Sequence, residues 1–146
     1  MRPKPDAIVV NWLDHQKNVS VWICSITQAE ILMGLAMMPE GKRQHGLMHV
    51  AAAMFNEDFA RRCLPFDSDA AKDYANIVSE RTRQGSPISV EDAQIASIAR
   101  ANGLSIATRN VKDFAKIEGL VVLNPWQVDL SQVALGTAPR GRAASD

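Results

Sequence analysis

The sequence predicts an α/β domain of three layers, in which a mostly parallel central sheet is flanked by helices. Short apolar segments rich in β-branched residues alternate with longer segments whose apolar residues recur at helical spacing. A strand, a short helix and a second strand follow one another between residues 104 and 123, which is the order found in parallel sheets. The length of 146 residues and the hydrophobic content of 47% fit one such domain.

The first half of the chain is predicted to hold one buried strand among three helices. A helix is expected at residues 5–16, because Val9, Trp12 and Leu13 lie on one helical face. Residues 19–26 (VSVWICSI) are rich in β-branched residues and apolar on both faces, which is typical of a buried parallel strand. Two further helices are expected at residues 28–38 and 42–62.

The second half carries clearer signals for where helices begin and end. After a short extended piece at residues 64–66, Asp67 is expected to cap one helix and Ser89 the next, which Asn102 and Gly103 close. The remaining elements are predicted at residues 104–107 (strand), 111–117 (short helix) and 120–123 (strand). We expect the folded domain at residues 1–126 and a disordered tail at residues 127–146.

Composition excludes some classes of protein. The longest uninterrupted apolar stretch, at residues 50–55, is far shorter than the roughly 18 residues of a membrane span, and no signal-peptide core follows Met1, so we expect a soluble cytoplasmic protein. Sixteen basic residues balance sixteen acidic ones, which disfavours nucleic-acid binding through a global field but allows a local basic face. Cys24 and Cys63 lack the spacing of zinc ligands and are interpreted as reduced core thiols.

One polar pattern occurs three times where a helix is predicted to start. Thr27, Ser89 and Asn110 each precede a carboxylate by three residues: Glu30, Asp92 and Asp113. Any single instance is most simply ordinary helix capping, since an acid in the first turn is stabilised by the helix dipole.

The positions of these acids favour a function beyond capping. Glu30 and Asp113 closely follow predicted buried strands, and the strand-to-helix turns of a parallel sheet emerge at the one edge where ligands bind. Carboxylates that converge without a nearby cation repel one another, and an all-oxygen set suits Mg²⁺ or Mn²⁺. The sequence therefore predicts a metal site built from Glu30, Asp92 and Asp113.

Other chemistries lack their motifs. Neither G-x-G-x-x-G nor G-x-x-x-x-G-K-[ST] occurs, so a nicotinamide enzyme and a P-loop nucleotidase are unsupported, and no G-x-S-x-G elbow marks a serine nucleophile. His45 and His49 have i,i+4 spacing but lack the glutamate of a His-Glu-x-x-His zinc motif. We interpret this pair as part of a solvated helix face.

Four stretches together resemble a known family. They are ITQAEILMGLAMMPEGKR (26–43), LPFDSDAAKDYANI (64–77), GSPISVEDAQIASIARANGLSIATRNVKDF (85–114) and LNPW (123–126). In this order they are similar to the PIN-domain toxins of bacterial type II toxin–antitoxin modules, in the VapC and FitB-like branch, over residues 6–126. The resemblance implies a PIN-like fold and a Mg²⁺-dependent ribonuclease that forms a homodimer. It also implies an antitoxin partner, which inserts into the active-site groove and often binds operator DNA.

The resemblance also implies roles for individual residues. Glu30, Asp92 and Asp113 match the family's acids, Asn110 occupies a position where relatives carry Asp or Asn, and Thr27 and Thr108 would support the acids from behind. Basic residues expected to contact the RNA backbone are Arg81, Arg83 and Arg109, although a solvated helix surface is the simpler interpretation of Arg81 and Arg83.

The chain departs from the family pattern at its start. Relatives begin with a central strand that ends in a Leu-Asp-Thr-Asn-like motif, whose Asp is a metal ligand, and this chain has neither. We therefore expect that about a dozen residues are absent upstream of Met1. Loss of a central strand would leave unpaired backbone groups on both neighbouring strands. The absence of the metal-ligand Asp keeps an alternative open: a non-catalytic PIN remnant that dimerises or binds an antitoxin.

Overall fold

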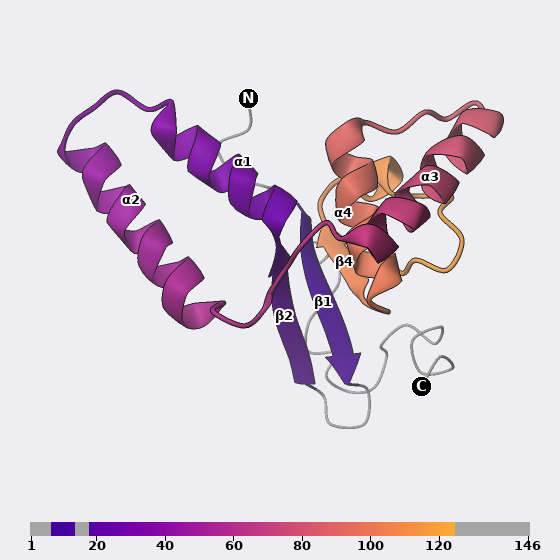
Figure 1. Cartoon of the computed structure of the whole chain (residues 1–146), viewed down its shortest axis with the longest axis horizontal. Coiled ribbons are helices and arrows are strands. Elements are labelled where there is room, and N and C mark those ends of the chain that lie inside the picture. The colour runs from indigo at the N-terminus through magenta and orange to yellow at the C-terminus, as the bar shows by residue number, and fades with distance from the viewer. Residues whose placement is uncertain (1–6, 14–17, 125–146) are drawn as a thin grey trace.

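A five-stranded mixed sheet forms the middle layer of the protein, in a computed structural model that describes residues 7–13 and 18–124 (Figure 1). Its strands lie in the order β3-β2-β1-β4-β5. β1 pairs antiparallel with both of its neighbours, whereas β2 with β3 and β4 with β5 are parallel pairs. Four strands therefore share one direction and β1 alone runs the other way. The strands are β1 (Ala7–Leu13), β2 (Asn18–Cys24), β3 (Cys63–Leu64), β4 (Ser105–Thr108) and β5 (Val122–Leu123).

The helix predicted at residues 5–16 is wrong. Ala7–Leu13 is the central strand β1, which pairs with β2 from Val9 opposite Trp22 and with β4 from Ala7 opposite Thr108. Its sequence AIVVNWL is rich in β-branched residues, which favour a strand. Pairing on both sides also satisfies backbone N–H and C=O groups of β2 and β4, which would stay unpaired if residues 7–13 formed a surface helix. The unpaired neighbours expected from a missing central strand are therefore not found, because β1 occupies that position.

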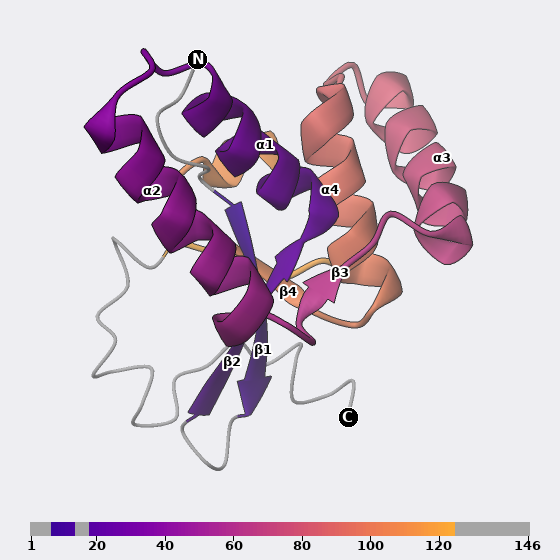
Figure 2. The same ribbon diagram turned by 60° about the vertical axis from the view of Figure 1, so that its left-hand side comes forward.

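The first two helices pack on one face of the sheet. α1 (Ser25–Ala36) and α2 (Lys42–Ala53) form a hairpin, and a single π-turn, η2 (Met54–Asp58), extends α2 (Figure 2). Buried Gln44 closes this hairpin, since its side-chain amide donates to the carbonyls of Leu35 (2.9 Å) and Met38 (3.2 Å) at the end of α1. The helix expected at 42–62 is shorter than predicted, since α2 ends at Ala53 and η2 at Asp58. Ala51 and Phe55 pack against Ile23 of β2 in a small core.

The other two helices pack on the opposite face and build the main core. α3 (Ser68–Arg83) and α4 (Val90–Ala101) lie side by side on the far side of the strands from α1 and α2 (Figures 1 and 2). Residues 95–99 of α4 are all buried, so this helix lies between the sheet and α3. The fully or nearly fully buried members of this core include Val9, Ala70, Ile77, Ile95, Ile98, Ile106 and Phe114. The predicted three-layer α/β architecture is confirmed.

Predictions made from local helix signals are confirmed where a side chain or a glycine fixes the end. Asp67 accepts a hydrogen bond from the Ala70 amide at 3.0 Å and caps α3. Gly103 has a φ of 67°, in the left-handed region that terminates α4. The helix expected at 111–117 is only the 3₁₀ turn η3 (Val111–Asp113), because Lys116 turns the chain with a φ of 63°.

The two cysteines lie on the neighbouring strands β2 and β3 as free thiols. Burial, with a smaller contribution from nearby Cys24, raises the pKa of the Cys63 thiol, and Cys24 has no exposed surface. Because thiolate is the reactive form, we expect both thiols of the native protein to react with Ellman's reagent at pH 8 much more slowly than after unfolding in guanidinium. Rapid labelling of two thiols in the native protein would contradict this packing.

Two further predictions concern the C-terminal tail and the absence of a membrane span. The tail predicted at residues 127–146 lies outside the described residues, as does the end of the proposed domain at 125–126. Within residues 7–13 and 18–124, no helix has both the length and the apolar composition needed to cross a bilayer.

Candidate functional site at the carboxyl edge of the sheet

The strand directions create one edge where several polar segments begin. β2, β3, β4 and β5 all end at this edge and antiparallel β1 starts there, so Ala7 lies beside Thr108. In open α/β sheets, ligands bind outside the carboxyl ends of the strands. The predicted site residues can now be placed relative to this edge.

Glu30 lies on the helix that leaves β2. α1 begins at Ser25, earlier than the sequence predicted, and Cys24 provides no side-chain cap. Thr27 is therefore inside the first turn, and its predicted capping role is wrong. Its buried hydroxyl instead donates a long hydrogen bond (3.5 Å) to the carbonyl of Ala7, which ties α1 to the start of β1. Glu30 follows one turn later and is partly exposed.

Asp92 lies in the first turn of α4, as predicted. The Ser89 hydroxyl accepts a hydrogen bond from the Asp92 amide at 3.2 Å, so the capping interpretation is confirmed here. Only a short turn joins α4 to β4, and the helix contacts that strand, so the chain doubles back and the start of α4 lies toward the carboxyl edge (Figure 1). The positive end of the helix dipole stabilises the charged form of a carboxylate at this position.

Asp113 and Asn110 lie in the turn that follows β4. Thr108 is completely buried, and its hydroxyl accepts a hydrogen bond from the Asn110 amide at 3.0 Å. The Asp113 amide donates to the Asn110 carbonyl, also at 3.0 Å, but the Asn110 side chain caps nothing, so its capping role is wrong. The result is a tight 3₁₀ turn that presents Asp113 to solvent.

The structure places the three acids on elements that start at one edge, but it does not bring them into a common ligand cluster. Among the residues it describes, no group of three or more His, Cys, Asp or Glu side chains could hold a metal ion. The donor chemistry suits Mg²⁺ nonetheless, because this ion is commonly held by one or two carboxylates and completed by water and phosphate oxygens. Metal binding by Glu30, Asp92 and Asp113 stays a prediction.

The three arginines predicted to contact RNA have different surroundings. Arg109 directly follows β4 and is exposed. Arg83 is also exposed, and it forms an ion pair with Glu80 at 2.9 Å on the surface of α3. Arg81 is only 6% exposed and donates its hydrogen bonds to backbone carbonyls within the fold. That arrangement carried no signal in the sequence, because the partners of Arg81 lie up to 34 residues away.

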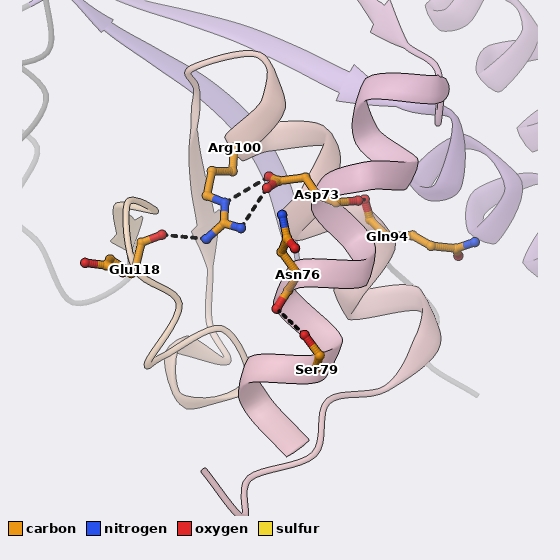
Figure 3. Close-up of polar contacts among 7 residues, drawn as sticks. Asp73, Asn76, Ser79, Gln94, Arg100 and Glu118 are labelled. Carbon is orange, nitrogen blue, oxygen red and sulfur yellow. Dashed lines mark hydrogen bonds and ion pairs between the residues drawn. The ribbon is translucent and has the colours of Figure 1, made fainter. Parts of the chain in front are cut away.

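A polar cavity of about 380 Å³ lies between the end of α3 and the turn before β5. Arg100 forms part of its wall: it binds both carboxylate oxygens of Asp73, at 2.9 and 2.7 Å, and donates to the Glu118 carbonyl (Figure 3). The hydrogen bonds that Arg100 donates to Asp73 raise the pKa of Arg100, so this guanidinium stays charged. Since Arg100 and Arg83 both bind carboxylates, this cavity is not an obvious anion site, and the carboxyl edge remains the candidate.

Comparisons with known proteins identify the family of the chain. The PIN domain profile matches residues 1–120 of the chain. The chain is 39% identical to the plasmid stability protein StbB of Pseudomonas syringae pv. tomato, over 86% of this chain and 90% of the relative. It is 36% identical both to the VapC ribonuclease Y4jK of Sinorhizobium fredii, over 86% of this chain and 89% of that relative, and to the toxin FitB of Neisseria gonorrhoeae, over 86% and 90%.

Solved structures share the fold. The structure of FitAB bound to an IR36 DNA fragment matches with a TM-score of 0.68 and 32% identity, over 74% of this chain and 75% of that one. The structure of FitAcB from Neisseria gonorrhoeae matches with a TM-score of 0.67 and 33% identity, over 73% and 76%. Both likenesses are high enough in sequence and in coverage to support common ancestry as well as a common fold.

Proposed function

We propose that this chain, which belongs to the PIN-domain family and to its VapC and FitB-like branch of toxin–antitoxin ribonucleases, hydrolyses RNA with the help of Mg²⁺ held by Glu30, Asp92 and Asp113. The observation that supports these residues is their position. Each acid is carried by an element that starts at the carboxyl edge of the sheet: α1, α4 or η3. Mn²⁺ is expected to replace Mg²⁺, because both ions prefer oxygen ligands.

The residues at this edge have separate tasks in the proposed reaction. A bound Mg²⁺ lowers the pKa of a water molecule and neutralises charge that develops on the phosphate. Buried Thr27 ties α1, which carries Glu30, to the start of β1. Buried Thr108 holds the turn after β4, which carries Asp113. Arg109 is exposed beside this turn and would bind a phosphate of the RNA backbone. Water then adds to phosphorus and the bond to O3′ breaks, which leaves 5′-phosphate and 3′-hydroxyl ends.

The proposal extends to partners. The structure of the relative FitAB is of a complex bound to a DNA fragment. We infer that this chain forms a homodimer, and that a cognate DNA-binding antitoxin silences it by inserting into the groove at the carboxyl edge. We expect the free toxin to act in the cytoplasm, where RNA substrates are found.

One observation favours a second candidate. The described residues contain no ready three-ligand metal cluster, which is what a non-catalytic PIN remnant would show if it only dimerised or bound an antitoxin. Such a protein would keep the fold and lose metal affinity.

Cleavage of RNA by the purified chain tests the two candidates together. We expect cleavage in Mg²⁺, none in excess EDTA, and recovery on adding Mn²⁺, alongside saturable Mn²⁺ binding measured by calorimetry. Cleavage that survives EDTA would contradict the metal-dependent mechanism. A folded protein that neither binds Mn²⁺ nor cleaves RNA would instead support the binding remnant.

A further inference from the structure

We infer that Arg81 is a positioning residue that fixes the backbone of Asp113. This inference rests on the proposed function, in which Asp113 binds a metal ion. Arg81 lies in the last turn of α3, and its guanidinium makes three hydrogen bonds to backbone carbonyls. Nε donates to Ser86 at 2.6 Å, and Nη1 donates to Asp113 at 3.1 Å and to Ala115 at 3.0 Å.

The turn that carries Asp113 has little regular structure to hold it. Between β4 and β5 the described backbone forms only the 3₁₀ turn η3. The Asp113 amide is held by the Asn110 carbonyl and its carbonyl is held by Arg81, so both backbone polar groups of this residue are fixed. The next side chain, Phe114, is buried in the main core at 2% exposure. With the backbone held on both sides, the direction in which the Asp113 carboxylate leaves the turn is set.

A guanidinium suits this task better than other side chains. Its planar fork can reach several carbonyls at once, and hydrogen bonds from a charged donor are stronger than those from a neutral one. Arg81 thereby joins the loop after α3, at Ser86, to two carbonyls of the Asp113 turn. Removing it would leave three carbonyls without this donor, in a region where the donor itself is almost completely buried.

The neighbouring Arg83 provides a matched comparison. It lies two residues further along the same helix, it is exposed, and its ion pair with Glu80 joins no other element. A surface pair of this kind contributes little to stability. Arg100 provides a second comparison, since it also joins a helix to a carbonyl of a turn, but its hydrogen bonds go to Asp73 and Glu118 instead of Asp113.

The test is made on the full chain with Arg81→Met, Arg83→Met and Arg100→Met. Hydrogen exchange at the amides of residues 113–115, which are all hydrogen bonded within the turn, reports its order directly. We expect faster exchange at these amides in Arg81→Met only. Unchanged exchange there in a folded Arg81→Met protein would overturn the inference, whatever the protein does to RNA. If Arg81→Met does not fold, Arg81→Lys, which keeps the charge but not the fork, is measured in its place.

Metal affinity then tests whether the turn acts through Asp113. Arg81→Met should weaken Mn²⁺ binding about tenfold, as loss of residues that orient metal ligands commonly does, while Arg83→Met and Arg100→Met should not change it. In an Asp113→Asn background, Arg81→Met should cause no further loss. An equal loss in both backgrounds would show that Arg81 does not act through Asp113. Mn²⁺ affinity that is insensitive to Asp113→Asn would overturn the proposed metal role of Asp113 and leave the exchange measurement to decide the positioning of the turn.

Discussion

Replacing Asp92 by asparagine is expected to lower the rate of RNA cleavage at least about 100-fold without unfolding the protein. The substitution keeps the shape of the side chain and removes the charge that would hold the metal. The Ser89 cap on α4 is retained, because it involves the backbone amide of residue 92 and not its side chain. The comparison is made from single-turnover cleavage rates in saturating Mg²⁺, together with thermal unfolding of both proteins.

Glu91 offers a close control for this experiment. It lies in the same first turn of α4 and is exposed, so Glu91→Gln removes the same charge from the same helix end. Both variants should lose a similar interaction with the helix dipole, about 0.3–1 kcal/mol, and only Asp92→Asn should lose activity. Full activity in Asp92→Asn, or equal losses in the two variants, would remove Asp92 from the proposed site.

Local signals in the sequence were sufficient where a helix end is decided by its own residues. Asp67 and Ser89 accept the expected amide hydrogen bonds, and Gly103 adopts the left-handed conformation that few other residues tolerate. Each of these signals acts over three or four residues, so a single sequence contains it.

Longer-range pairing decided the elements that the sequence did not predict. Val9, Trp12 and Leu13 have helical spacing, yet residues 7–13 form the central strand, because β2 and β4 both supply partners for its backbone. The start of α1 shifted for a related reason. The predicted strand included Ser25 and Ile26, but β2 ends at Cys24 and the chain enters α1 at the next residue.

The candidate site shows the same division. Residue types and their spacing selected Glu30, Asp92 and Asp113 as candidates, and the elements that carry them begin at one edge of the sheet, while their metal role stays a prediction. No pattern could indicate that Arg81 reaches the carbonyl of Asp113, because 32 residues separate the two and the acceptor is backbone, which every residue carries.

The position of β1 at the centre of the sheet leads to a prediction about stability. Val9 is 1% exposed and packs in the main core, whereas its neighbour Ile8 points to the other face and is 37% exposed. Val9→Asp would bury a carboxylate among apolar groups with no cation to pair with it, at a cost of at least about 4 kcal/mol. A loss of this size is a large share of the roughly 5–15 kcal/mol that stabilises a typical domain.

Ile8→Asp is the matched control, since it places the same charge one residue away on the same strand. It should lower the free energy of unfolding by less than about 1.5 kcal/mol, because the carboxylate can reach water. Urea unfolding followed by circular dichroism would measure both values. The contrast follows from the alternation of side chains across a strand, in which neighbouring residues face opposite sides. Similar losses in the two variants would mean that residues 7–13 do not form the central strand in solution, and the arrangement of Ala7 beside Thr108 at the carboxyl edge would have to be abandoned with it.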